Sequence, residues 1–350
     1  MAAERTVSVP LVSVVIVNWN GKGILEECLR SIYSQPFKSF EVVVVDNGST
    51  DGSADAVKKT YPEAVVRENK ENLGFARGNN IGIEAASKGS KYILTLNNDT
   101  VLDRSFLAEL IGAAEASPET VGMWAPKILS MEDNSLIDSV GGLLIYQDGL
   151  AKGRGRLEKD DGQYDCPVDA FIPSACAGLY RKKMLAGIGG FDDDFFAYCE
   201  DTDLGLRARL AGWEALSVPK AVVFHLYSAT GGRYTPFKAY LVERNRVWVA
   251  VKNLPMPLLI KGIFYTKWRY LVQVYGIISG KGAGARFAEG FSRFELVSIL
   301  LRAYFDAFRG LSGMYKKRLR IQRSRKVSIS EFGRLLKKYR LRAADLSLKD

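Results

Sequence analysis

The first hundred residues alternate short apolar runs with segments of helical periodicity. Apolar, β-branched runs are typical of strands buried on both faces of a parallel sheet. The segments expected to be strands are Val12–Val17, Phe40–Val45, Val65–Glu68 and Tyr92–Leu96. The segments expected to be helices are Ile24–Gln35, Ala54–Thr60, Gly78–Ser87 and Ser105–Ala116. This order of strand, loop and helix predicts an α/β fold with a doubly wound, mostly parallel sheet.

Polar motifs follow three of the predicted strands at their carboxyl ends. Asn18 comes after the first strand, Asp46 after the second, and Asp99 soon after Tyr92–Leu96. Ligands of open α/β sheets bind beyond the carboxyl ends of the strands. Three polar loops that converge on one edge therefore predict a nucleotide site.

The pattern is less regular in the second half of the chain. Residues 121–171 contain only hints of short strands. Glu200–Leu210 has the periodicity of an amphipathic helix, and Ala221–Phe224 is a strand that ends at His225. A further helix is expected at Tyr240–Val251.

Two apolar, aromatic stretches, Leu254–Ile260 and Tyr270–Ser279, are separated by basic residues. Because no uncharged stretch reaches 18 residues, we predict no transmembrane helix. The stretches fit either a helical pair in a membrane interface or a pair packed on the preceding domain, and both can hold together. We therefore expect four regions. They are a tail at 1–9, a domain at 10–235, this helical region at 236–310 and a basic tail at 311–350.

The positive charge of the chain is concentrated in its C-terminal part. The 350 residues carry a net charge of +10, with ordinary globular fractions of 47% hydrophobic and 25% charged residues. After Pro255, 21 Lys and Arg stand against 6 Asp and Glu. Such a segment can bind nucleic acid or anionic lipid, or simply aid solubility. Since no nucleic-acid-binding motif accompanies it, we expect an anionic membrane surface and no nucleic acid.

The cysteines and the first residues indicate the compartment. Cys28, Cys166, Cys176 and Cys199 form neither a CxxC pair nor a zinc spacing, so we expect buried or incidental thiols. A reducing cytosolic compartment fits them best. The run Val12–Val17 is too short for a signal peptide, and none is expected.

Two acidic clusters are candidates for chemistry. Asp99 in Asn97-Asn98-Asp99 stands where a carboxylate can hold Mg²⁺ or Mn²⁺ between two phosphates, although a plain turn is the alternative. Glu200-Asp201 opens a helix just after the aromatic run Phe191–Tyr198. Apolar surroundings raise the proton affinity of a carboxylate, as a general base requires. The alternative for this pair is helix capping.

Two further residues stand at strand ends. His225 is the single histidine of the chain, and imidazole is a good ligand for manganese-like ions, although a lone histidine is more often structural. Asp46 could accept a hydrogen bond from a nucleobase N–H, whereas Asp-Asn-Gly is also a strong turn sequence.

Taken together, five stretches resemble the family-2 glycosyltransferases, which have the GT-A fold. The stretches are Val12–Gly21 (VSVVIVNWNG), Glu41–Ser53 (EVVVVDNGSTDGS), Asn72–Asn80 (NLGFARGNN), Leu96–Thr100 (LNNDT) and Gly189–Leu210 (GGFDDDFFAYCEDTDLGLRARL), followed by His225. The resemblance is strongest to the rhamnosyltransferase-like branch, which builds polysaccharides and glycolipids at the inner face of the membrane. It implies a catalytic domain at 10–235 and a cytoplasmic protein, peripheral on the inner face of the cell membrane.

The resemblance also implies which side chains bind the donor, a nucleotide-diphosphate sugar. The side chains expected at the nucleoside are Asn18, Asn20 and Asp46, with Asp46 on the base. The side chains expected along the rest of the donor are Asn72, Arg77 and Asn79. Arg233, in a Gly-rich loop, would close over the diphosphate.

The metal motif departs from the family pattern. Asn97-Asn98-Asp99 occupies the family's DxD position, with Asn98 at the donor and Asp99 as the metal ligand. Asn97 can still bind a ribose hydroxyl but brings no charge. The resemblance therefore implies a Mn²⁺ or Mg²⁺ ion held by Asp99, the diphosphate and His225, with a less strict requirement for metal.

The reaction implied is an inverting single displacement. Asp201 would take the proton of the acceptor hydroxyl, which belongs to a saccharide or a lipid-linked saccharide, and Glu200 would position the acceptor. One alternative is a non-catalytic sugar-nucleotide-binding or scaffold protein at the membrane, which would lack the acidic pair or Asp99. A nucleotidyltransferase would need a basic, Gly-rich loop where Asn18-Trp19-Asn20-Gly21 stands. A nucleic-acid-binding protein is suggested by charge alone.

Overall fold

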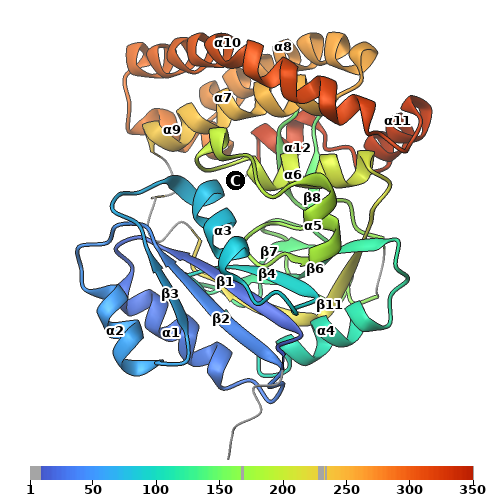
Figure 1. Ribbon diagram of the computed structural model, residues 1–350. Coiled ribbons are helices and arrows are strands. Elements are labelled where there is room, and N and C mark those ends of the chain that lie inside the picture. The colour runs from blue at the N-terminus through green and yellow to red at the C-terminus, as the bar shows by residue number, and fades with distance from the viewer. Residues whose placement is uncertain (1–8, 167–168, 228–231, 233–234, 350) are drawn as a thin grey trace, which may run out of the picture.

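A mixed β-sheet forms the centre of the protein. The computed structural model describes residues 9–349 except 167–168, 228–231 and 233–234. Among these residues, nine strands form one sheet in the order β3-β2-β1-β4-β10-β6-β11-β5, with β7 beside β6 (Figure 1). The strands are β1 (Val12–Asn18), β2 (Phe40–Asp46), β3 (Val65–Glu68), β4 (Tyr92–Asn97), β5 (Thr100–Leu102), β6 (Val121–Ser130), β7 (Ile137–Val140), β10 (Leu179–Arg181) and β11 (Glu214–His225). A separate hairpin consists of β8 (Leu143–Ile145) and β9 (Ala151–Gly153).

The register of β1 brings distant polar residues to one edge. β1 runs parallel to both β2 and β4, so that Asn18 lies opposite Asp46 and Val17 lies opposite Asn97. β10 is inserted antiparallel between β4 and β6. The predicted α/β fold is therefore confirmed. Its sheet is mixed, with parallel pairing among β1, β2, β3 and β4 and between β6 and β11, and antiparallel pairing of β5, β7 and β10.

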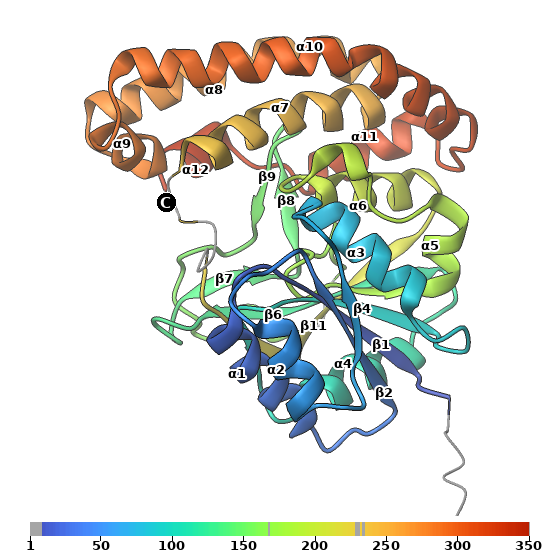
Figure 2. The same ribbon diagram turned by 60° about the vertical axis from the view of Figure 1, so that its left-hand side comes forward.

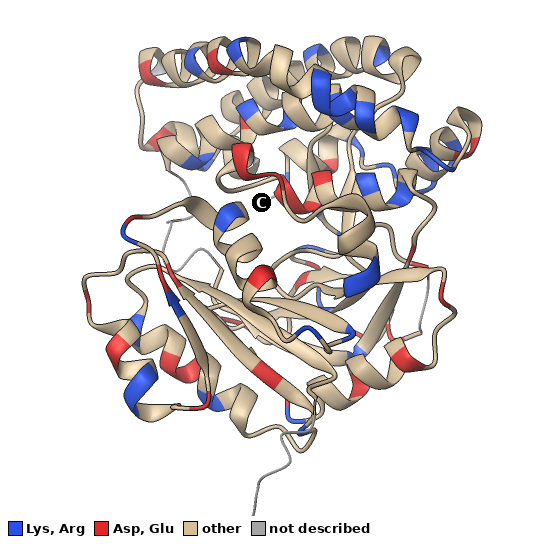
Figure 3. Cartoon of the chain, viewed as in Figure 1, with Lys and Arg blue, Asp and Glu red and all other residues tan. Residues whose placement is uncertain are grey.

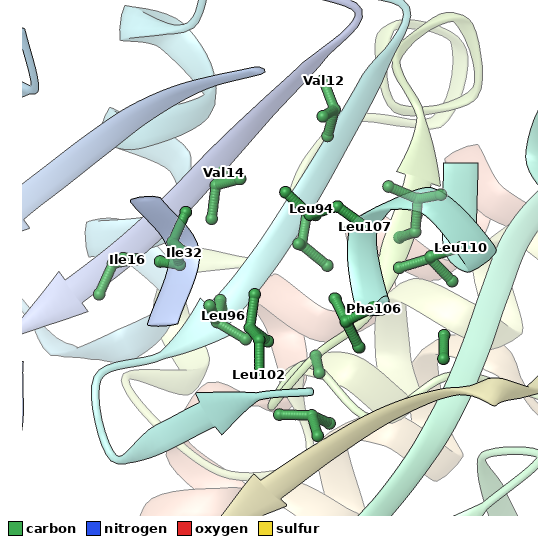
Figure 4. Packing of buried hydrophobic residues seen from close by; sticks show 14 of the residues in the cluster. Val12, Val14, Ile16, Ile32, Leu94, Leu96, Leu102, Phe106, Leu107 and Leu110 are labelled. Atoms are coloured by element: carbon green, nitrogen blue, oxygen red, sulfur yellow. The ribbon is translucent and has the colours of Figure 1, made fainter. Parts of the chain in front are cut away.

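Alternate residues of β1 face two apolar layers, because successive side chains of a strand point to opposite faces. Val12, Val14 and Ile16 pack with α1, α2 and α4, and Figure 4 shows this layer around Leu94 and Leu107. Val15 belongs to the opposite layer, with α3, α5 and α6. The helices are α1 (Lys22–Tyr33), α2 (Ser53–Thr60), α3 (Gly74–Ala85), α4 (Phe106–Glu115), α5 (Lys182–Ile188) and α6 (Glu200–Leu210). Both faces of the sheet are thus covered, as a doubly wound fold requires.

The rest of the chain forms a helical layer on the α6 side of the sheet (Figures 1 and 2). Its helices are α7 (Pro236–Asn253), α8 (Met256–Ile278), α9 (Gly282–Glu289), α10 (Arg293–Arg323), α11 (Ile329–Lys338) and α12 (Ala343–Ser347). Trp248 of α7 and Met314 of α10 share a buried cluster with Leu206 of α6. α10 continues through residue 310, where the sequence suggested a regional boundary. Hydrophobic contacts thus anchor α7 and α10 on the domain.

Buried ion pairs also hold this layer. The Arg269 guanidinium of α8 is fully buried and lies 2.8 Å from both Asp148 Oδ2 and Glu243 Oε1. Lys252 of α7 lies 2.8 Å from Asp203 Oδ1 in α6. A buried charge is tolerated only when it is paired in this way. Within the described part of the chain, none of the helices has the length and apolar character needed to cross a membrane.

Candidate active site

A cavity of about 530 Å³ opens at the carboxyl ends of β1 and β4. Its other walls come from the β7–β9 segment, the loop before β10, the residues before α6 and the start of α7. The residues expected in the site that line this cavity are Asn72, Asn97, Asn98, Asp99, Glu200, Asp201 and His225. The expected residues outside its lining are Asn18, Asn20, Asp46, Arg77 and Asn79. Arg233 lies outside the described residues.

Asn18 and Asp46 form a buried polar base beneath the cavity wall. The Asn18 amide lies 3.3 Å from Asp46 Oδ1 and donates to Ser53 Oγ at 2.9 Å. Its Oδ1 accepts a hydrogen bond of 2.8 Å from the Asn98 amide, which does line the cavity. The parallel register of β1, β2 and β4 thus orients Asn98 from below.

Asn20 and Asn72 shape the loops above this base. The Asn20 Oδ1 accepts from the Thr50 N–H at 2.8 Å and so ties the loop after β1 to the loop after β2. Asn72 Oδ1 accepts from the Gly74 N–H at 2.9 Å. The φ of Gly74 is +83°, and a Cβ there would lie 2.6 Å from the Phe196 carbonyl oxygen. Only glycine fits this contact between α3 and the segment before α6.

Two residues expected along the donor point elsewhere. Arg77, on α3, lies 3.2 Å from Glu84 Oε1 and 3.6 Å from Asp193 Oδ2. Asn79 is buried and donates to the Phe75 carbonyl oxygen of its own helix at 2.9 Å. The structure therefore does not bring these two side chains together with the residues of the cavity.

The Asp99 carboxylate meets His225 at one wall. His225 Nε2 lies 3.3 Å from Asp99 Oδ1, and His225 Nδ1 lies 2.7 Å from Asp138 Oδ2. Burial alone would lower the pKa of His225, but contacts with Cys176, Asp138 and Asp99 raise it well above its ordinary value. Asp138 lines the same cavity and was missed by the sequence, because it lies 87 residues from His225.

The donor set at this wall suits a weakly held divalent cation. Asn97 Oδ1 is buried and has no hydrogen-bond partner among the described residues, and the buried Asp99 Oδ1 faces His225 Nε2 at 3.3 Å without a well-formed hydrogen bond. A bound ion is one explanation for an unsatisfied buried oxygen. Within the described residues, no three His, Cys, Asp or Glu side chains are placed to hold one ion. Asp99 and His225 could therefore supply two ligands, which fits an ion that takes the others from water and substrate.

The acidic pair lies at the start of α6, after a strained segment. Phe196, Tyr198 and Cys199 have φ values of 64°, 68° and 65°, in the left-handed region that non-glycine residues rarely adopt. Such strain costs about 1–3 kcal/mol per residue and is found at functional sites. It brings both Glu200 and Asp201 into the lining of the cavity.

Burial changes the proton affinity of both carboxyl groups. It raises the pKa of Asp201 above its ordinary value, and hydrogen bonds from the N–H groups of Ala175 and Thr202 oppose the rise. Burial and the neighbouring Asp201 charge raise the pKa of Glu200 well above its ordinary value. Glu200 Oε2 has no hydrogen-bond partner among the described residues. The pair therefore holds one proton more readily than two separate carboxyl groups would, with Glu200 as its preferred site.

The strained segment is held from α7 by Asn245, which the sequence did not reveal. The fully buried Asn245 amide donates to the carbonyl oxygens of Phe195, Ala197 and Tyr198 at 3.0, 2.8 and 2.7 Å. A helix of the C-terminal layer thus positions the residues that precede the acidic pair. No local motif marks this role, because the contacts span nearly 50 residues.

Basic side chains add positive charge to the cavity lining. Lys152, Arg156 and Lys238 all line it and were missed by the sequence, although Lys152 and Arg156 belong to a small basic cluster, KGRGR. The Arg156 guanidinium lies 4.0 Å from the Tyr227 ring centre, and Lys238 Nζ lies 3.3 Å from Tyr227 Oη. Burial would raise the pKa of Tyr227, but these two cations lower it. Arg156 also forms an ion pair with Asp138, which offsets part of its charge. The lining can therefore favour an anion beside Asp99, opposite the carboxyl pair of α6.

Comparison with known proteins agrees with this geometry. The sequence model of the family "Glycosyl transferase family 2" matches residues 13–188. The N-acetylglucosaminyl-diphospho-decaprenol L-rhamnosyltransferase of Mycobacterium tuberculosis is 28% identical over 245 residues, which cover 63% of this chain and 77% of that protein. The O-antigen biosynthesis protein RfbC of Myxococcus xanthus is 27% identical over 233 residues, which cover 63% of this chain and 18% of that protein.

Two solved structures share the fold. The mannosyltransferase PcManGT from Pyrobaculum calidifontis, in complex with GDP-Man and Mn²⁺, superimposes with a TM-score of 0.52 at 18% identity, covering 90% of this chain and 86% of that one. GalNAc-T7 with UDP, GalNAc and Mn²⁺ superimposes with a TM-score of 0.56 at 17% identity, covering 70% of this chain but only 48% of that one. The chain therefore belongs to glycosyl transferase family 2, has the GT-A fold and resembles a rhamnosyltransferase.

Proposed function

We propose that this glycosyltransferase moves a sugar from a nucleotide diphosphate to an acceptor hydroxyl with inversion, and that Asp201 is the base. One observation carries the proposal: a single cavity is lined by Glu200 and Asp201 on one wall and by Asp99 and His225 on another. Single displacement needs a base on the acceptor side and positive charge on the leaving-group side. The cavity offers both.

The donor would lie over the carboxyl ends of β1, β2 and β4. Asp46 and Asn18 would lie at the nucleoside, with Asn20 in the loop beside it, but all three lie outside the cavity lining and are supported less than the residues that line it. Asn97 would bind a ribose hydroxyl, while Asn72 and Asn98 contact the rest of the donor from the cavity wall. Arg77 and Asn79 are supported less, because their side chains bind Glu84, Asp193 and the α3 backbone instead.

Asp99 and His225 would hold a Mn²⁺ or Mg²⁺ ion, and binding would require His225 to lose the proton that it holds next to Asp99. Such an ion, when bound, neutralises charge that develops on the leaving diphosphate. The second nitrogen of His225 contacts Asp138, an arrangement that orients a ligating imidazole. Lys152, Arg156 and Lys238 line the same cavity and would add fixed positive charge near the phosphates. With these cations present, the reaction depends less strictly on the metal.

The proton is handled by the pair at the start of α6. Glu200 keeps the shared proton and positions the acceptor, while ionised Asp201 takes the proton of the attacking hydroxyl. The acceptor oxygen bonds to the anomeric carbon as the bond from that carbon to the diphosphate breaks. The nucleoside diphosphate leaves with the electron pair, and the configuration at the anomeric carbon inverts.

We further propose a saccharide or lipid-linked saccharide as acceptor, and a cytoplasmic protein on the inner face of the membrane. The mycobacterial relative is named for a diphospho-decaprenol acceptor and L-rhamnose, which supports this class of acceptor and rhamnose as a first sugar to test. The basic C-terminal segment supports an anionic surface as the place of action.

The decisive experiment compares the native chain with Asp201→Asn. A panel of nucleotide sugars, including dTDP-, UDP- and GDP-linked ones, is first screened with Mn²⁺ and candidate acceptors. Asp201→Asn should lose about 10²–10⁴-fold in kcat and keep its calorimetric donor affinity, since a base acts mainly in the transition state. NMR of the product should show the inverted anomer. Retained turnover in the variant would rule out Asp201 as the base. A native chain that binds donors without any transfer would instead support the scaffold alternative.

A further inference from the structure

The helices α8 and α10 expose long apolar rows on the side of the molecule away from the sheet. The two helices lie side by side there, and Tyr270 Oη of α8 is 2.9 Å from Tyr304 Oη of α10 (Figures 1 and 2). We call the exposed side chains of these helices the outer face. Its apolar members on α8 are Met256, Ile260, Ile263, Phe264, Trp268, Leu271, Val274, Tyr275, Ile277 and Ile278. Its apolar members on α10 are Phe294, Val297, Leu301, Tyr304, Phe305, Phe308, Tyr315 and Leu319.

These rows expose more apolar surface than is typical of a monomeric protein in water. Phe264, Phe308 and Ile278 have 67%, 73% and 80% of their surface exposed. Each helix buries its opposite side instead, with Gly262 and Gly276 of α8 packed closely against neighbouring backbone. Contiguous apolar patches of this kind mark binding surfaces.

Of the side chains that the structure describes, the charged ones on the outer face are basic, apart from one acidic residue at the start of α10. The exposed basic residues of the two helices are Lys261, Lys267, Arg302, Arg309, Lys316, Arg320 and Arg323. α8 contains no acidic residue, and Glu295, at the start of α10, is the exposed acidic residue among the described parts of both helices. Asp306 is turned inward and accepts a hydrogen bond from Tyr240. Figure 3 shows the basic residues along α8 and α10.

We propose that the outer face lies flat on an anionic lipid bilayer. The inference rests on the proposed function, because it names the surface on which a lipid-linked acceptor would be met. Apolar and aromatic side chains mixed with Lys and Arg are the composition of a helix in a membrane interface. Basic side chains extend their charged ends to lipid headgroups while their stems cover apolar surface. A second copy of this chain is a poorer partner, since two outer faces would oppose like charges.

The structure joins the outer face to the cavity through a buried ion pair. Arg269, on the inner side of α8, donates to Asp148 Oδ2 at 2.8 Å. Asp148 lies in the turn of the β8–β9 hairpin, whose residues Leu143 and Ala151 line the cavity. The helix that rests on lipid would therefore also fix the position of a wall of the reaction site.

The test is co-sedimentation of the full chain with phosphatidylcholine vesicles, with and without phosphatidylglycerol. Phe264→Ser/Phe308→Ser removes apolar contact, and Arg309→Glu/Lys316→Glu removes charge. Val9→Ser is the apolar control, because Val9 is 61% exposed and lies far from the helical layer. Lys59→Glu/Lys88→Glu is the charge control, since it changes the net charge by the same amount at exposed lysines outside α8 and α10. Circular dichroism and melting verify that each variant is folded.

Both outer-face variants should bind anionic vesicles about tenfold more weakly or worse, and both controls should bind like the native chain. Higher salt should weaken native binding, because it screens the basic residues. Native-like binding by the outer-face variants, or equal binding to neutral and anionic vesicles, would overturn the proposal. It would also be overturned if light scattering showed a dimer that Phe264→Ser/Phe308→Ser dissociates while vesicle binding stays unchanged. Sugar transfer to a water-soluble acceptor is measured in parallel. Loss of this transfer in the native chain would contradict the proposed function, whereas failure of the membrane proposal alone would leave it unchanged.

Discussion

The side-chain amide of Asn245 lies 2.7 Å from the carbonyl oxygen of Tyr198 and donates a hydrogen bond to it. Asn245 belongs to α7, in the C-terminal helical layer, whereas Tyr198 lies two residues before the acidic pair on α6. Tyr198 has a φ of 68°, a strained value that costs energy and persists only because neighbouring groups impose it. The C-terminal layer therefore contributes to the geometry of the site as well as to the bulk of the protein.

Replacing Asn245 by Ala should lower kcat about 10–100-fold with little change in donor affinity, because the strained segment relaxes and Asp201 moves away from its place. The variant should also unfold about 1–3 kcal/mol more easily, since buried carbonyl groups lose their partner. Steady-state kinetics, donor calorimetry and denaturant titration measure kcat, the donor affinity and the free energy of unfolding.

Asn253→Ala is the matched control for Asn245→Ala. It removes a buried amide on the same helix that binds Asp203 and Val249, so it should lose stability and keep kcat. Equal losses of kcat in the two variants would reduce Asn245 to a structural role.

The two carboxyl groups on α6 should respond differently to amide substitution. Because Glu200 holds the shared proton, Glu200→Gln should cost less than about tenfold in kcat, whereas Asp201→Asn should cost about 10²–10⁴-fold. The raised pKa of Asp201 also predicts that kcat/KM falls with decreasing pH at a higher pH than an ordinary aspartate would give. Rate profiles over pH with saturating metal check both points. A larger loss in Glu200→Gln would reverse the roles of the two residues.

The same raised pKa values predict a cost in stability at neutral and alkaline pH. At low pH both carboxyl groups are protonated in the folded and the unfolded chain. As pH rises, the unfolded chain releases these protons first, so the free energy of unfolding falls until the folded groups ionise as well. Asp201→Asn should therefore raise the melting temperature at pH 8 more than at pH 4. Calorimetric melting at both pH values measures the difference. Equal shifts in melting temperature would show that ionisation of Asp201 does not lower the stability of the folded protein.

Asp99→Ala should remove most of the metal-dependent part of donor binding, because it deletes the buried carboxylate that faces His225 in the cavity lining. Asp138→Asn should weaken the metal-dependent binding about 10–100-fold, as loss of a partner of a ligating histidine does. Titration of donor with and without Mn²⁺ gives the comparison. Asp103→Asn serves as the control, since the Asp103 carboxylate accepts hydrogen bonds from Ser105 in a turn and does not line the cavity. Unchanged Mn²⁺ dependence in Asp99→Ala would remove Asp99 from the metal site.

Local patterns were enough to predict the strands at the centre of the sheet. β1, β2 and β4 each extend only one residue beyond the expected apolar run. β10 was missed, because three residues inserted antiparallel leave no periodicity. β11 starts seven residues before the expected Ala221, and a register irregularity between Val218 and Val222 interrupts its pattern. Contacts made between strands determine these features, and a single segment does not contain them.

Tertiary contacts also explain the errors in the helical region and the site. The sequence divided α8 at its basic residues, although Arg269 is fully buried against Asp148. Within the site, the residues recognised were those that follow strands, such as Asp99, and the acidic pair that opens α6. Asp138, Lys238 and Asn245 reach the cavity or the segment before α6 from distant parts of the chain. Nothing next to them in the sequence marks them.

The position of α7 has a geometric consequence. Its first turns line the cavity with Phe237 and Lys238, and further along Trp248 donates to the Ala307 carbonyl oxygen of α10 at 3.1 Å. A helix is about 10 Å across, so little more than one helix separates the reaction site from the outer layer. If the outer face rests on a membrane, α7 would hold the cavity at a fixed distance from that surface. We therefore expect the protein to select acceptors by how far their hydroxyl extends from that surface, in addition to their chemistry.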